Sequence, residues 1–88
     1  MPERTVVIAS KVGLHSRPAA MFTELARKQP AKVTIGKPGQ DPVDAASILH
    51  IMTLGAEGGQ EVVLRAEGDG AEASLDALEA FLKIDHDA

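Results

Sequence analysis

The stretch Glu61–Glu67 has the clearest alternation of apolar and polar positions in the chain. Val62, Leu64 and Ala66 fall on one side of this pattern, and charged residues dominate the other side. A period of two residues predicts a β-strand with one buried face. Because such a strand needs neighbouring strands and a layer that covers its apolar face, the chain must build a sheet covered on one side.

Further strands are predicted on either side of the first helical pattern. Thr5–Ala9 and Lys32–Ile35 both alternate between apolar and polar residues. The segment GKPGQDP (residues 36–42) contains the Gly and Pro typical of a hairpin loop, and a short strand around Val43 would follow it. We therefore expect four strands in all.

Two stretches predict the first two helices. Ser16–Lys28 has apolar residues at helical spacing, and Pro18 is tolerated because it falls in the first turn. Ser47 stands where an N-cap would, before a short helix that ends at Leu54–Gly55. This short helix contains Ile48, Leu49, Ile51 and Met52, which cannot all point inward, so we expect some of them to stay exposed.

Asp69 and Glu72 are spaced as a capping box for a third helix, whose apolar face is formed by Leu75, Leu78 and Leu82. The order is β-α-β-β-α-β-α, which resembles a split βαβ plan plus one helix. It predicts an α+β fold with the helices on one face of a mostly antiparallel sheet. At 88 residues we expect one domain, residues 1–88.

Composition argues against several classes of protein. The formal net charge is -4, which disfavours nucleic acid as the main partner because that affinity comes largely from Lys and Arg on phosphates. There are no cysteines and no apolar run near the roughly 20 residues that span a bilayer, so we expect no membrane insertion and a cytoplasmic location. No His, Asp or Glu cluster has specific metal-ligand spacing, and we expect no metal and no cofactor.

One histidine stands at the predicted junction of strand and helix, in KVGLHSRPAAMF (residues 11–22). His15 immediately precedes the first helix, whose unpaired N–H groups and dipole favour an anion. The dipole disfavours imidazolium, so His15 should stay neutral and nucleophilic. A phosphoryl group on it could contact the backbone N–H groups of Ser16 and Arg17 and the Arg17 guanidinium.

The segment GLHSRPAA (residues 13–20) matches the G-[LIV]-H-x-R-P-A signature of HPr, the family of histidine-containing phosphocarrier proteins of the bacterial phosphoenolpyruvate-dependent sugar phosphotransferase system. Chain length and element order match as well, so the resemblance covers essentially the whole chain. It implies an open-faced β-sandwich with a four-stranded antiparallel sheet in strand order 1-4-2-3 and three helices on one face.

The resemblance also implies a function. His15 would accept a phosphoryl group on Nδ1 from phosphorylated Enzyme I and pass it to the A component of a sugar-specific Enzyme II, with Arg17 stabilising the phosphate. The protein would be a carrier rather than an enzyme, and we expect a monomer. Val12 departs from the family, because relatives often carry a polar residue there that can assist the phosphohistidine.

A second site has a counterpart in ASILHIMTLG (residues 46–55). By resemblance, Ser47 matches a serine that an ATP-dependent HPr kinase phosphorylates in many Gram-positive relatives, although it is also well placed as a helix cap. Relatives often have Lys before this serine and Gly three residues after it, where this chain has Ala46 and His50. These two departures weaken the match to a kinase substrate.

The family docks partners through an apolar patch beside the histidine. By resemblance, the matching residues and a basic rim are Ala20, Ile48, Leu49, Met52 and Arg27.

Three other hypotheses are less well supported. An acylphosphatase-like hydrolase would need a catalytic asparagine, and the chain contains no Asn. An RNA-recognition module would need aromatics on its sheet, yet Phe22 and Phe81 both fall in predicted helices. An HPr-like regulator that binds transcription factors without relaying phosphate would not need His15.

Overall fold

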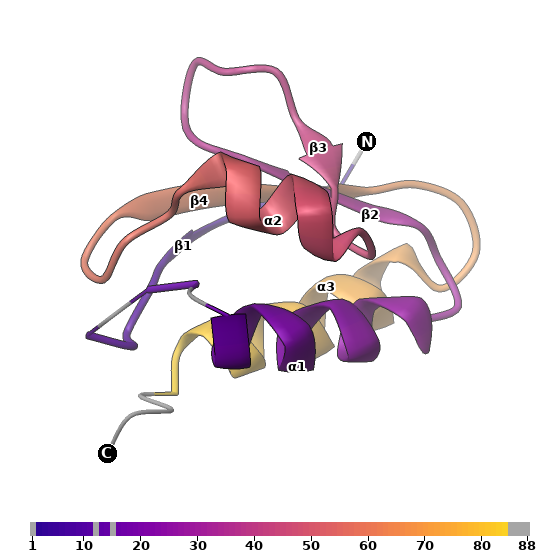
Figure 1. Cartoon of the computed structure of the whole chain (residues 1–88). Coiled ribbons are helices and arrows are strands. Elements are labelled where there is room, and N and C mark those ends of the chain that lie inside the picture. The colour runs from indigo at the N-terminus through magenta and orange to yellow at the C-terminus, as the bar shows by residue number, and fades with distance from the viewer. Residues whose placement is uncertain (1, 12, 15, 85–88) are drawn as a thin grey trace.

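The computed structural model describes residues 2–11, 13–14 and 16–84 of the chain. Figure 1 shows seven elements in the predicted order: β1 (Glu3–Val7), α1 (Ser16–Arg27), β2 (Val33–Gly36), β3 (Val43–Asp44), α2 (Ile48–Leu54), β4 (Glu61–Ala66) and α3 (Ala71–Leu82). The first strand begins and ends earlier than the alternation of Thr5–Ala9 predicts. Ile8 nevertheless stays on the buried side, with 2% of its surface exposed.

The four strands form one antiparallel sheet in the order β1-β4-β2-β3, which confirms the order that the resemblance implied. Val6 lies opposite Val62, and Leu64 lies opposite Ile35, so these apolar side chains share the covered face. Thr5 and Val63, one position along each strand, pair on the other face. The alternation of β4 thus divides the sheet into a covered face and an open face.

The three helices lie on the covered face, and α1 runs beside α3 (Figure 1). The two aromatic residues join these helices, because the rings of Phe22 and Phe81 lie 5.7 Å apart between centroids and are tilted by 56°. Most of the remaining core is aliphatic, and each fully buried large side chain contributes about 1.5–3 kcal/mol. The fully enclosed large apolar side chains include Phe22, Ile35, Ile51, Val62, Leu64, Leu75 and Leu78.

The start of α3 differs from the sequence prediction, and the predicted capping box of Asp69 and Glu72 is wrong. The N-cap residue is Gly70, and no side chain caps the helix there. Glu72 instead accepts a hydrogen bond at 2.8 Å from the guanidinium of Arg4, on β1. The Glu72 carboxylate, which the local pattern assigned to the helix end, belongs instead to a long-range ion pair.

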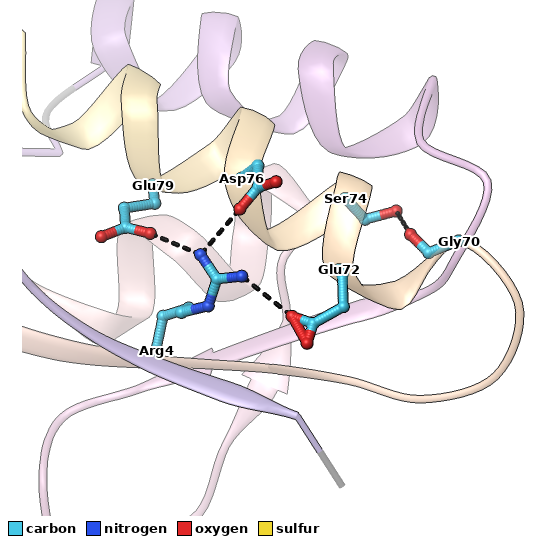
Figure 2. A network of polar contacts seen from close by, with 6 residues as sticks. All are labelled: Arg4, Gly70, Glu72, Ser74, Asp76 and Glu79. Atoms are coloured by element: carbon cyan, nitrogen blue, oxygen red, sulfur yellow. Dashed lines mark hydrogen bonds and ion pairs between the residues drawn. The ribbon is translucent and has the colours of Figure 1, made fainter.

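Arg4 lies on the helix side of β1 and meets three carboxylates of α3, as Figure 2 shows. Its guanidinium is 2.8 Å from Glu72 and Asp76 and 2.7 Å from Glu79. These hydrogen bonds, led by the one to Asp76, raise the pKa of Arg4 above its usual range. Hydrogen bonds from Lys83 and then Arg4 lower the pKa of Glu79. The network ties the first strand to the last helix.

Candidate functional site

Helix α1 begins at Ser16, as the sequence predicts. His15 itself, like Val12, lies outside the described residues, but the next residue, Ser16, is the first of α1. Ser16 and Arg17 are exposed, whereas Pro18 is buried. The first turn therefore presents a hydroxyl and a guanidinium to solvent at the N-terminus of a 12-residue helix, where backbone N–H groups are free to bind an anion.

The Arg17 guanidinium forms no ion pair with any residue in the described ranges, so its charge is not already neutralised there. Arg4 is different, since it meets three carboxylates. An exposed guanidinium without an acidic partner can make charge-assisted hydrogen bonds to phosphate oxygens.

The segment that leads to this helix rests on the loop after α2. The N–H of Leu14 donates to the carbonyl of Ala56 at 2.9 Å, and the Leu14 side chain is buried. Gly13 has φ = +69°, and a Cβ there would lie 2.5 Å from the Cα of Glu57 and closer still to the Ala56 carbonyl oxygen. Only glycine fits both the backbone angle and the space at this position.

Helix α2 begins and ends as the sequence predicts. Ser47 is its N-cap, and the Ser47 hydroxyl accepts a hydrogen bond from the His50 N–H at 3.3 Å. Gly55 closes the other end in the left-handed conformation, with φ = 64°. The capping role of Ser47 is thus confirmed, and its phosphorylation stays a prediction.

The apolar surface expected on α2 is present. Leu49 is 73% exposed, Met52 45% and Ile48 40%, while Ile51 alone in this helix is fully buried. We call Ile48, Leu49 and Met52 the α2 patch. Helix α2 contacts α1, on which the predicted docking residue Ala20 is exposed. Three large apolar side chains exposed together on one short helix are typical of a surface that binds another protein.

Arg27, the predicted basic rim, has structural contacts that the sequence did not reveal. Its Nε donates to the carbonyl of Ala46 at 3.3 Å, and its guanidinium is 3.6 Å from Glu24. The side chain still keeps 55% of its surface exposed. Arg27 therefore connects the end of α1 to the residue before the Ser47 cap, and its predicted role in partner binding stays untested.

No helix within the described ranges combines the length and the apolar character needed to cross a bilayer. Residues 2–11, 13–14 and 16–84 also contain no group of three or more His, Cys, Asp or Glu side chains arranged to hold a metal ion.

Comparisons with known proteins agree with the fold and the signature. A family model described as the PTS HPr component phosphorylation site matches residues 2–83. The phosphocarrier protein HPr of Streptomyces coelicolor is 46% identical over 78 residues, which cover 89% of this chain and 84% of the relative. The HPr of Haloferax volcanii is 49% identical over 81 residues, or 91% of each chain.

Among solved structures, that of HPr-C-His from Thermoanaerobacter tengcongensis superposes with a TM-score of 0.87 at 41% identity, covering 94% of this chain and 92% of that one. The strand order, the helix that begins beside the signature histidine and these similarities over most of the length lead to one assignment. The chain belongs to the HPr family of phosphocarrier proteins.

Proposed function

We propose that this protein relays a phosphoryl group in sugar uptake, with His15 accepting it from phosphorylated Enzyme I and donating it to the A component of a sugar-specific Enzyme II. The observation that carries the proposal is the start of α1 at Ser16, next to His15 in sequence. That helix end offers N–H groups for an anion, and Arg17, which pairs with no acidic residue in the described ranges, follows the acceptor in sequence. The protein acts as a phosphorylated intermediate and not as an enzyme.

The transfer requires a neutral imidazole. The lone pair on His15 Nδ1 attacks phosphorus, the new N–P bond forms, and the bond from phosphorus to the donor breaks with its electron pair returning to the donor. N–H groups of the first turn, including those of Ser16 and Arg17, stabilise the phosphoryl oxygens, and the Arg17 guanidinium adds a charge-assisted hydrogen bond. The same groups hold the phosphoryl group until the second partner removes it.

The α2 patch supplies the contact with both partners. A relay must bind each partner and release it, which suits a small apolar patch better than a large permanent interface. Ala20 extends the patch onto α1, and Arg27 provides a basic rim. We further propose that the relay works as a cytoplasmic monomer, and that an HPr kinase or a transcriptional regulator would meet the chain at Ser47 and the adjoining patch.

The test is mass spectrometry after incubation with phosphoenolpyruvate and a heterologous Enzyme I. We expect one added phosphoryl group, labile to acid and stable to alkali, on the wild-type protein. The His15→Ala variant should gain none. The matched control is His50→Ala, which removes an exposed histidine from α2 and should leave the added mass in place.

Absence of any added mass on the folded wild-type protein, while a control HPr is phosphorylated by the same Enzyme I, would refute the relay. Phosphorylation that persists in His15→Ala would place the acceptor elsewhere. Incubation with ATP and an HPr kinase tests Ser47 separately, with Ser47→Ala as its control; modification that survives this substitution would contradict the assignment.

A further inference from the structure

The loop Ala56–Gln60 lies directly against the segment that leads to the acceptor position. The N–H of Ile8 donates to the Gln60 carbonyl at 3.0 Å, and the N–H of Gly59 donates to the Ile8 carbonyl at 2.9 Å. Farther along, the N–H of Leu14 donates to the carbonyl of Ala56. Two backbone segments distant in sequence are thus joined at Ile8 and again at Leu14.

Gly58 sits at a second close approach of these two segments, besides the one at Gly13. A Cβ on Gly58 would lie 2.6 Å from the Lys11 carbonyl oxygen and closer still to that of Ser10, whereas real Cβ contacts essentially never fall below 3.0 Å. The obstacle is backbone, which cannot rotate away as a side chain can. Gly58 also lacks the positive φ seen at Gly59, so its backbone conformation alone does not demand glycine.

The Ser10–Lys11 turn that Gly58 touches is continuous with the acceptor position. The N–H of Gly13 donates to the Ser10 carbonyl at 3.0 Å, which closes the turn and directs the chain toward Leu14. Leu14 is fixed by Ala56 on one side of the acceptor, and α1 fixes Ser16 on the other. A shift of the turn would therefore be transmitted to the residues that flank His15.

We propose that Gly58 is a positioning residue for phosphoryl transfer, because its missing side chain lets the Ala56–Gln60 loop pack directly against the backbone of Ser10 and Lys11, which precede the acceptor. The proposal rests on the relay proposed above, since it concerns the same acceptor. The proposed role needs no contact of Gly58 with the phosphoryl group or with the α2 patch. Gly58 acts through the backbone of Ser10 and Lys11.

The test compares Gly58→Ala with two glycine controls. Gly39→Ala and Gly68→Ala both replace a glycine of positive φ with no atom within 4 Å of the new Cβ, and both lie in other loops, so they introduce backbone strain away from the segment. For Gly58→Ala we expect the kcat of phosphorylation by Enzyme I to fall about tenfold to a hundredfold, as misplacement by about 1 Å does elsewhere. KM should change little, because the α2 patch is untouched.

A second readout separates positioning from a general loss of stability. Titration of the His15 ring followed by nuclear magnetic resonance should give an altered pKa and altered ring shifts in Gly58→Ala, with wild-type values in both glycine controls. Wild-type kcat and an unchanged His15 titration in Gly58→Ala would overturn the proposal while leaving the relay intact. If the wild type accepts no phosphoryl group, the relay fails, and the His15 titration still reports on positioning.

A milder variant decides the question if Gly58→Ala does not fold. The exposed Gln60 side chain accepts a hydrogen bond from the Glu57 N–H at 2.9 Å and so closes the same loop. Gln60→Ala should lower kcat about twofold to tenfold and shift the His15 resonances, because the loop loses the side-chain hydrogen bond that closes it. Gln60→Glu keeps the acceptor and should restore both, and Gln40→Ala, in the β2–β3 loop, is the remote control. Wild-type behaviour of Gln60→Ala would count against the proposal.

Discussion

Helices α2 and α3 cover the same face of the sheet, but the surfaces that they present to solvent differ in chemistry. The outer face of α3 carries Glu72 and Asp76, both bound to Arg4 of β1. The outer face of α2 carries the α2 patch, in which Leu49 is 73% exposed and Ile48 and Met52 are partly exposed. Ion pairs complete the surface of α3, whereas α2 leaves apolar side chains exposed to solvent. The difference separates residues selected for folding from residues available for contact.

The two helices also differ in how much support they need. Helix α3 has 12 residues and buries several large side chains. Helix α2 has seven residues and buries only Ile51. Isolated helices below about 12–15 residues are marginal, so α2 depends on its caps and its single buried anchor. A short helix held in this way suits the docking role proposed for it, because it can adjust to several partners.

The largest expected effect is on stability, and it distinguishes the inner face of α3 from the outer face of α2. Leu78→Ala removes a fully buried side chain and should lower the free energy of unfolding by about 2–5 kcal/mol. Leu49→Ala, at 73% exposure, should change it by less than about 0.5 kcal/mol. Urea denaturation of both variants gives the two values. Similar losses would mean that Leu49 is as important to the fold as Leu78.

The next effect concerns partner binding. Leu49→Glu places a charge in the α2 patch and should slow phosphoryl transfer to an Enzyme II A component about tenfold, the equivalent of about 1.4 kcal/mol, with the fold unchanged. Ile84→Glu is a matched control, since Ile84 is 56% exposed but follows α3. Transfer kinetics of both variants provide the measurement. Equal transfer rates in Leu49→Glu and Ile84→Glu would mean that the α2 patch has no special role in partner binding.

A smaller effect should follow from uncapping α2. Ser47→Ala removes the acceptor for the His50 N–H and should cost about 1 kcal/mol. Hydrogen exchange should rise within α2 and stay unchanged in α3. Ser47→Asp keeps a capping oxygen and should retain wild-type exchange. Faster exchange in α3 as well would show that the two helices are not independently supported.

The smallest effect is expected from the charged surface of α3, and it depends on pH. Because the folded protein lowers the pKa of Glu79, this carboxylate adds stability above its ordinary value of 4.5 and loses that contribution as pH falls through the lower folded value. Arg4 stays charged throughout this acid range. Arg4→Gln should therefore lower the melting temperature near neutral pH, with the difference from wild type shrinking below about pH 4.5.

Salt provides a second check on the same variant. Screening weakens exposed ion pairs, so the difference between Arg4→Gln and wild type should also shrink at about 1 M salt, where the Debye length is about 3 Å. Arg65→Gln, which removes the single exposed pair with Glu3 on the open face, is the matched control and should have a smaller effect. A difference that persists in acid and in high salt would assign the role of Arg4 to packing.

The sequence predicted what depends on local periodicity. The alternation in β4 fixed which face is buried, and the crowding of apolar residues in α2 indicated that Leu49 could not be enclosed. The Ser47 cap was also predictable, because the acceptor and its N–H donor lie three residues apart. These features require no knowledge of distant parts of the chain.

Long-range contacts account for what the sequence did not predict. The predicted capping box at α3 was wrong because the N-cap is Gly70 rather than Asp69, and Glu72 binds Arg4, 68 residues earlier. The acidic stripe of Glu72, Asp76 and Glu79 at helical spacing was a signal that a cation could lie opposite, but it did not identify Arg4. The approach of Gly58 to Ser10 had no local signal, because it arises only when the two loops are brought together.

The Phe22–Phe81 pair makes the molecule unusual to study by optical methods. The chain has no Trp or Tyr, so these two rings are its only aromatic side chains apart from histidine. Their ellipticity in the near ultraviolet should report on the packing of these two rings, which meet between α1 and α3. That band therefore serves as a built-in gauge of whether the helix next to His15 remains docked, and it needs no added label.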